Sequence, residues 1–197
     1  MKTLPLPSAD ALAHRLIAVA TDFVGLNEVA SNAHWDDART LWPETDKDVW
    51  LRTWMQKVTG WKPGAPYCAA FAGAVMAAVL YSARVSMIQL NNSFLDVWTA
   101  HCMTNVRNLK RRGQLRDEPV PGALWLARHG TTDSGHAGIV AAVNGRQMST
   151  IEGNTNDAGG REGDGIFTKL LPIKGRGNLT TQGFLHPETV LAIINKL

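Results

Sequence analysis

Before Pro119, apolar residues recur at the three- and four-residue spacing of helices. A first helix is predicted to follow a capping Ser8 and to run through Val24, ahead of Gly25. A second is predicted over 46–58, where the apolar positions form one stripe. The stripe positions of the two helices are Leu12, Leu16, Ala20 and Val24, then Trp50, Leu51, Trp54, Met55 and Val58.

The next apolar run has no polar interruption. Ala69 to Tyr81 contains no charged or strongly polar side chain, and Pro66 stands just before it. Proline suits a first helical turn because its φ is fixed near the helical value. The run is too short to span a bilayer, so a buried helix is predicted. A further helix is expected from Asn91 to about Lys110.

From Pro119 onward the pattern changes to short apolar and β-branched runs separated by glycine, which is typical of strands. The expected strands are 123–127, 136–143, 147–154, 165–171 and 182–186, followed by a helix over 188–195. Helices that precede strands predict an α+β domain, with amino-terminal helices packed on a carboxy-terminal antiparallel β-sheet. The length and the lack of repeats predict that residues 1–197 form a single domain.

Charge excludes one class of partner. The 197 residues carry 20 Lys and Arg against 17 Asp and Glu, which is far from the basic load of a dedicated nucleic-acid binder. Asp10, His14 and Arg15 interrupt the first apolar stretch, so no signal peptide is readable. We therefore expect a protein made in the cytoplasm, with neither nucleic acid nor membrane insertion among its interactions.

Five basic residues surround Gly113, and they admit two interpretations. They are Arg107, Lys110, Arg111, Arg112 and Arg116. One interpretation is a solvated end of the preceding helix. The other is a docking patch for an anionic polymer, whose binding would weaken steeply with salt.

Cys68 is the most distinctive chemical group, because it stands at the start of the uninterrupted apolar run. The unpaired N–H groups and positive dipole end of a helix favour a thiolate there, which lowers the pKa below the free value of roughly 8.5. Such a sulfur is a nucleophile. The alternative is a small core residue, since free cysteines are often buried. With Cys102 as the second cysteine no disulfide framework is present, and two free thiols are expected.

A predicted hairpin brings a histidine and a carboxylate together. The strands that hold His136 and Glu152 flank a turn at 143–145. A three-residue loop would pair Ala142 with Arg146 and so set His136 opposite Glu152. A two-residue Asn-Gly turn would put them on opposite faces. The catalytic interpretation therefore requires the longer loop.

With that register, Asn154 shares the face of Glu152, so His136 gains two candidate orienting partners. Glu152 is the stronger one, because a carboxylate would fix the ring tautomer and stabilise the imidazolium that forms when His136 takes the thiol proton. A histidine in a strand is more often structural. The small residues around it, Gly135, Ala137 and Gly138, indicate that another group approaches closely.

Three motifs together resemble the CHAP peptidoglycan hydrolases, relatives of the NlpC-type papain-like cysteine peptidases. They are Pro66-Tyr67-Cys68-Ala69-Ala70-Phe71, Gly135-His136-Ala137-Gly138-Ile139 and Ile151-Glu152-Gly153-Asn154. Their order and separations are similar to those of the family. Three further segments extend the likeness over most of the chain: Gly25-Leu26-Asn27-Glu28, Arg161-Glu162-Gly163-Asp164-Gly165 and Gly183-Phe184-Leu185-His186-Pro187.

The resemblance implies a papain-like fold and hydrolysis of an amide bond in peptidoglycan. Cys68 would attack the carbonyl, His136 would act as base and then acid, Glu152 would orient the ring and Asn154 would support it. Both an N-acetylmuramoyl-L-alanine amidase and a peptide endopeptidase fit. The alternative is a non-catalytic cell-wall-binding or structural protein of the same fold.

The resemblance also implies where the protein acts. Delivery by phage lysis, a phage tail or a specialised secretion system would bring it to the bacterial cell wall or periplasm, as an endolysin or antibacterial effector. The partner is then peptidoglycan, with an immunity or delivery protein as a further one, and we expect a monomer.

Substrate contacts are expected from Trp61 and Tyr67, which stand just before the nucleophile. The backbone N–H of Cys68 would serve the oxyanion, and the second donor is open between Tyr67 and the distant Gln56. The chemistry needs no cofactor and no metal. Three alternating carboxylates resemble a calcium loop but lack the EF-hand glycine and could equally cap a helix: Glu44, Asp46 and Asp48.

Overall fold

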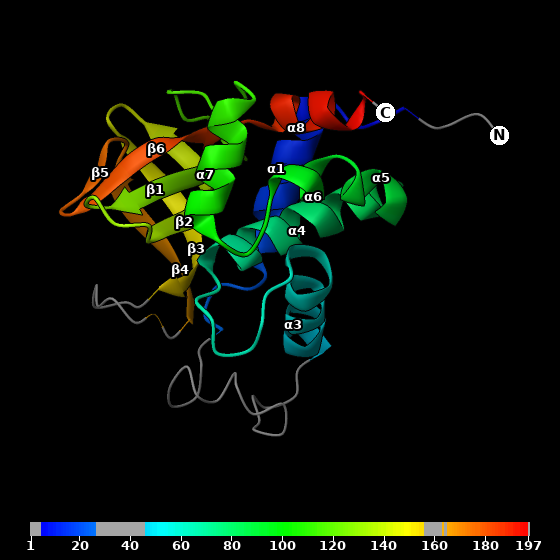
Figure 1. Cartoon of the computed structure of the whole chain (residues 1–197), viewed down its shortest axis with the longest axis horizontal. Helices are drawn as coiled ribbons and strands as arrows, with labels where there is room; N and C mark the ends of the chain where they lie inside the picture. The colour runs from blue at the N-terminus through cyan, green and yellow to red at the C-terminus, as the bar shows by residue number, and fades with distance from the viewer. Residues whose placement is uncertain (1–4, 27–45, 156–162, 164, 197) are drawn as a thin grey trace.

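A computed structural model describes residues 5–26, 46–155, 163 and 165–196, without the side chains of 46–49. The helices are α1 (Ala9–Thr21), α3 (Asp46–Thr59), α4 (Cys68–Ser82), α5 (Met87–Asn91), α6 (Phe94–Val97), α7 (Cys102–Arg111) and α8 (Pro187–Ile194). The strands are β1 (Leu124–His129), β2 (Gly135–Asn144), β3 (Gln147–Thr155), β4 (Gly165–Pro172), β5 (Gly175–Arg176) and β6 (Leu179–Leu185). All the described helices except α8 precede the strands along the chain, so the predicted α+β class is confirmed (Figure 1).

The uninterrupted apolar run forms the central helix. Every residue of α4 from Cys68 to Leu80 is buried, because α1, α3, β2 and β3 all pack against it. The predicted cap of α1 is also present, since the Ser8 hydroxyl accepts a hydrogen bond from the Ala11 N–H. Within the described part of the chain, none of the helices has the length and apolar character needed to cross a membrane.

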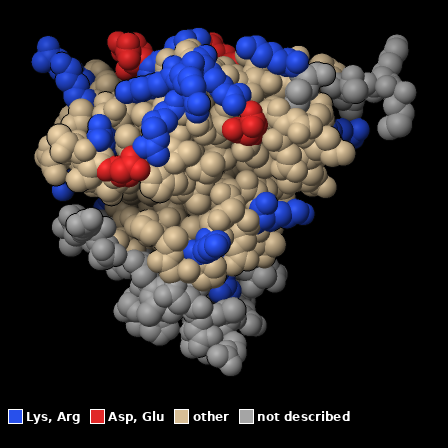
Figure 2. All heavy atoms as spheres, in the orientation of Figure 1, with Lys and Arg blue, Asp and Glu red and all other residues tan. Residues whose placement is uncertain are grey.

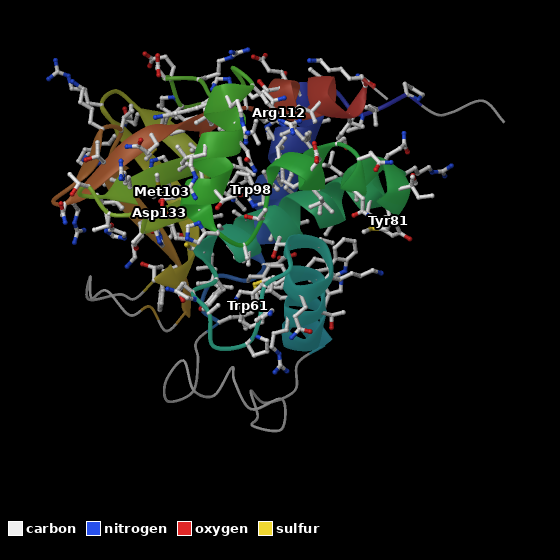
Figure 3. All side chains as sticks on the ribbon, viewed as in Figure 1. Trp61, Tyr81, Trp98, Met103, Arg112 and Asp133 are labelled. Atoms are coloured by element: carbon white, nitrogen blue, oxygen red, sulfur yellow. The ribbon has the colours of Figure 1, made fainter. Side chains whose placement is uncertain are left out.

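The single helix predicted from Asn91 to Lys110 is wrong, because this stretch holds the end of α5, then α6 and α7. Trp98 is extended between α6 and α7, and its indole Nε1 donates to the carbonyl of Ala69 on α4 over 2.9 Å (Figure 3). Asn105 is completely buried, accepts from the Thr99 N–H and donates to the Thr99 carbonyl. One tertiary hydrogen bond and two local ones therefore stabilise the extended segment in place of a continuous helix.

One antiparallel sheet of six strands carries the second half of the domain, in the order β4-β3-β2-β1-β6-β5. Five strands match the predicted ones within a few residues, and the two-residue β5 was not predicted. In Figure 1 the sheet stands to one side of the helices, and α7 lies across it. Contacts of α4 and α7 with β2 bring both helices to the same strand.

Both faces of the sheet bury apolar side chains. Leu124, Leu126 and Ile139 join the large core that the helices share. Trp125 and Val140 alternate with them and belong to a second, smaller cluster on the other face. His136 is on the Trp125 side, and the two rings meet edge to face with centroids 6.0 Å apart.

The β2–β3 hairpin differs from the predicted one. The turn is at residues 145–146, Asn144 pairs with Gln147, and Ala142 pairs with Ser149 instead of Arg146. Continued along the strands, this register would put His136 and Glu152 on opposite faces. A β-bulge between Val140 and Ala142 shifts the pairing by one residue, so that Ile139 faces Ile151 and the two side chains share a face.

The approach of Trp98 to α4 leads to a stability prediction. A Cβ on Gly73 would be 2.4 Å from the Trp98 Nε1, and this indole is rigid, buried and hydrogen-bonded. Helix propensity favours Gly73→Ala by about 1 kcal/mol, whereas overpacking costs about 1–3 kcal/mol. We expect net destabilisation of up to about 2 kcal/mol in urea unfolding. In a double-mutant cycle, Trp98→Phe should relieve part of the loss, and strict additivity would contradict this account.

Candidate functional site

The candidate nucleophile lies where the first turn of α4 meets the start of β2. Cys68 is the first residue of α4, and its thiol is in hydrogen-bond contact with the imidazole of His136. Backbone N–H groups from both elements also face the sulfur, that of Ala69 in the helix and that of Ala137 in the strand. The sulfur is therefore surrounded by donors, an environment that favours the thiolate.

Glu152 holds the other side of the imidazole ring. The His136 Nε2 lies 2.8 Å from the Glu152 Oε2, which leaves Nδ1 for the thiol. The second carboxylate oxygen accepts a hydrogen bond from the hydroxyl of Thr150, which is completely buried. The side chains thus form a chain of hydrogen bonds in the order Thr150, Glu152, His136 and Cys68.

Gly138 makes the contact between Glu152 and His136 possible. The predicted register sets Glu152 directly opposite His136. In the structure Glu152 lies beside Gly138, so its side chain reaches His136 diagonally. A Cβ on Gly138 would lie 2.8 Å from the Glu152 Cγ. Without a side chain there, the carboxylate can lean across the strand to the ring.

The electrostatics of the buried pair favour charge separation. Burial raises the pKa of the Cys68 thiol, but the positive His136 and the N–H donors outweigh it and hold that pKa below its ordinary value. Burial lowers the pKa of His136, but Cys68 and Glu152 outweigh it and raise the pKa above its ordinary value. Both shifts favour a thiolate beside an imidazolium.

Asn154 supports the site at a different point from the predicted one. Its Oδ1 accepts a hydrogen bond from the Tyr67 N–H over 3.3 Å, and its φ of 55° is left-handed. Between the described residues, no hydrogen bond joins Asn154 to the His136 ring. A Cβ on the preceding Gly153 would be 2.9 Å from Phe71 of α4. Gly153 and Asn154 therefore seat the start of α4 on β3.

The two residues predicted to contact substrate are buried instead. Trp61 is 3% exposed and Tyr67 is 1% exposed, and their rings pack edge to face with centroids 6.5 Å apart. The Trp61 Nε1 donates to the Ala65 carbonyl over 2.8 Å, which closes the loop before Cys68. Their contacts shape that loop. Gln56, a weaker candidate for the oxyanion, is exposed on α3.

Sequence reasoning missed three residues around His136. Thr150 shares a face with Glu152 because it stands two positions earlier in the strand, and alternation could have found it. Trp125 supports the ring from β1. Cys102, the second free and buried thiol, donates to the His136 carbonyl over 3.1 Å. Neither of these contacts has a signal in the sequence, because both depend on tertiary packing.

The basic cluster gathers on one side of the molecule, over the end of α7 and the neighbouring α8 (Figure 2). Each of its five members has a partner within the chain. Arg107 pairs with Asp133, Arg112 with Asp96, Lys110 with Gln182, Arg111 with Asn108 and Arg116 with the Gly113 carbonyl. These contacts favour the solvated surface over the docking patch.

The carboxylates considered for calcium cannot be placed. Glu44 and the side chains of Asp46 and Asp48 lie outside what the structure describes. Half of one segment of the family resemblance, 25–28, and most of another, 161–165, fall outside it as well.

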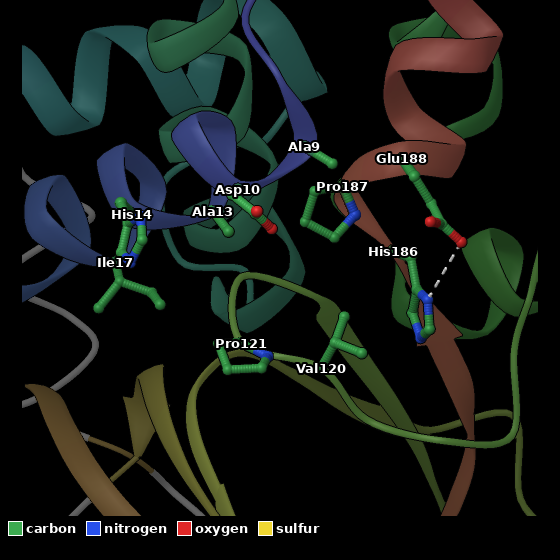
Figure 4. A pocket seen from close by; sticks show the side chains of 10 residues that line it. All are labelled: Ala9, Asp10, Ala13, His14, Ile17, Val120, Pro121, His186, Pro187 and Glu188. Atoms are coloured by element: carbon green, nitrogen blue, oxygen red, sulfur yellow. Dashed lines mark ion pairs between the residues drawn. The ribbon is translucent and has the colours of Figure 1, made fainter.

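A separate hollow of about 390 Å³ lies between α1, the segment before β1 and the start of α8 (Figure 4). At its edge the His186 Nδ1 is 3.7 Å from the Glu188 Oε1, while the Nε2 of the same ring donates to the Glu118 carbonyl over 2.7 Å. No residue of the Cys68 site lines this hollow.

The ion pair predicts how Cys68 titrates. Alkylation of Cys68 by iodoacetamide should follow a pKa below that of an ordinary thiol, because His136 stabilises the thiolate. His136→Ala should raise this pKa above the ordinary value, since burial, the largest cause, is then opposed only by the two backbone N–H groups. Glu152→Gln should raise it less, because the carboxylate acts through the imidazolium.

The measurement is the alkylation rate against pH, with the modified cysteine located by peptide mass spectrometry so that Cys102 is counted separately. An unchanged Cys68 titration in folded His136→Ala would contradict the ion pair.

Gly138→Ala should separate Glu152 from His136. The new methyl group would overlap the Glu152 side chain, which is held at both carboxylate oxygens. We expect destabilisation of about 1–3 kcal/mol from overpacking, and a Cys68 pKa that moves toward that of Glu152→Gln. Adding Glu152→Ala should recover much of the stability but not the low pKa. If Cys68 in Gly138→Ala titrates as it does in the wild type, the contact between Glu152 and His136 does not lower the Cys68 pKa.

Comparison of the chain with family models, with curated proteins and with solved structures finds no match. The site is therefore known from its own geometry.

Proposed function

We propose that this protein is a papain-like cysteine hydrolase that cleaves an amide bond of bacterial peptidoglycan. The observation that carries the proposal is the line of hydrogen-bonded groups from Cys68 through His136 to Glu152. A nucleophile, a base and a group that orients the base are the three parts of covalent acyl transfer. A purely structural role would not require a buried thiol and a buried carboxylate on either side of one imidazole.

The proposed reaction has two stages. The Cys68 thiolate attacks the amide carbonyl, and the His136 imidazolium gives its proton to the leaving amine, so that a thioester forms and the C–N bond breaks. His136, now neutral, takes a proton from water, and the resulting hydroxide attacks the thioester. Release of the carboxylate product returns Cys68 to the thiolate and His136 to the imidazolium.

The tetrahedral oxyanion needs hydrogen-bond donors. The backbone N–H of Cys68 is suited to this task, because the first N–H groups of a helix have no partner within the helix. Glu152 is 3% exposed, and its carboxylate bonds keep the ring oriented through both stages.

Peptidoglycan as the substrate is supported by the resemblance of the Cys68, His136 and Glu152 motifs to the CHAP hydrolases. The bond is the one between sugar and stem peptide for an amidase, or one within the peptides for an endopeptidase. Access to the wall would come through phage lysis, a phage tail or a secretion system.

Purified peptidoglycan tests the proposal. Wild-type protein should reduce the turbidity of a wall suspension, and Cys68→Ala or His136→Ala should lower turnover by roughly 10³-fold or more, with a smaller loss for Glu152→Gln. Tyr81→Phe, at the exposed far end of α4, is a matched control that should keep full activity.

Mass spectrometry of the soluble products identifies the bond, since an amidase and an endopeptidase leave different new termini. Equal turbidity loss with wild type and Cys68→Ala would contradict the proposal that the protein is a cysteine hydrolase. Retained wall binding with no product from either protein would establish the non-catalytic alternative.

A further inference from the structure

The second thiol lies directly behind the catalytic strand. Cys102 is the first residue of α7 and is 5% exposed. Its Sγ is 3.1 Å from the His136 carbonyl oxygen and 3.6 Å from the Ala127 carbonyl oxygen on β1. The thiol thus bridges the backbones of the two strands at the level of the imidazole.

The His136 carbonyl and the Ala137 N–H belong to one peptide unit. The bond is trans, because the described chain has no cis peptides, and in a trans unit the C=O and N–H point in opposite directions. The carbonyl meets Cys102, and the N–H meets the sulfur of Cys68. The two thiols therefore lie on opposite sides of the same peptide.

The ladder between β2 and β3 leaves this N–H available. Their pairing ends at Ile139 and Ile151. In a continuous ladder the N–H of Ala137, two residues earlier in β2, would donate to β3. Beyond that point the first turn of α4 packs on Gly153. The peptide at 136–137 has thus lost a ladder contact on the Cys68 side.

We propose that Cys102 is a positioning residue, whose S–H holds the His136–Ala137 peptide in place so that its N–H stays directed at the Cys68 sulfur. A hydrogen bond to the carbonyl also polarises the peptide and strengthens the N–H as a donor. Cys102 acts through the peptide and does not contact substrate.

Two further observations suit this role. Burial, and then the negative Cys68, raise the pKa of Cys102 well above its ordinary value, so that it keeps the proton it donates. Trp98 stands four residues earlier and donates to the Ala69 carbonyl in the first turn of α4. One segment, 98–102, therefore supports the backbone on both sides of the nucleophile.

The test compares Cys102→Ala, which removes the donor, with Cys102→Ser, which keeps one. In Cys102→Ala we expect the Cys68 titration to shift to higher pH and the alkylation rate of Cys68 at neutral pH to fall about two- to fivefold, about what the loss of part of one hydrogen bond produces. Cys102→Ser should recover most of the wild-type rate. Met103→Leu is the matched control, because Met103 is equally buried, also contacts Gly135 and carries no donor.

Urea unfolding of each variant separates a loss of stability from a shift of the Cys68 titration. The proposal is overturned if Cys102→Ala titrates like wild type, if Cys102→Ser shifts as far as Cys102→Ala, or if Met103→Leu shifts equally.

The inference builds on Cys68 as the nucleophile of the proposed hydrolase, but alkylation needs no substrate. A protein that leaves peptidoglycan intact would therefore still give an answer about Cys102. If it does hydrolyse peptidoglycan, Cys102→Ala should lower kcat and leave KM unchanged, because Cys102 acts on the reacting thiolate and does not contact substrate.

Discussion

The charge separation between the Cys68 sulfur and the His136 ring depends on a polar junction built inside an apolar domain. Burial disfavours both charges, so each needs partners close by. The sulfur has the ring and two backbone N–H groups, and the ring has Glu152. Most of the contacts around the junction of α4, β2 and β3 can be understood as supplying these partners or holding them in position.

Three glycines, which have no side chain, are as important to this junction as the functional groups. Gly138 lets the Glu152 carboxylate cross the strand, Gly153 lets α4 approach β3, and Gly73 admits the indole of Trp98. In each case a methyl group would meet a heavy atom within 3.0 Å. The three glycines therefore permit close approach between elements, a role different from that of a glycine in a turn.

The differences between expectation and structure have one cause. The helix predicted over 91–110 is divided because Trp98 and Asn105 find better partners in extended backbone. The hairpin register differs because a bulge in β2 changes which side chains share a face. Asn154 and Trp61 secure the loop before Cys68. Hydrophobic periodicity carries no information about any of these, since each depends on the hydrogen-bond partners that the folded backbone brings together.

The sequence by itself determined the α+β class, the positions of α1, α3 and α4, five of the six strands, and Cys68, His136 and Glu152 as the residues to examine. Periodicity and the residue types that support nucleophilic chemistry are local properties, so they can be read without a fold. Tertiary structure alone decided that these groups meet, through a bulge that returns two side chains to one face. It also decided that Cys102 stands behind the strand, because packing between α7 and the sheet has no counterpart in local sequence.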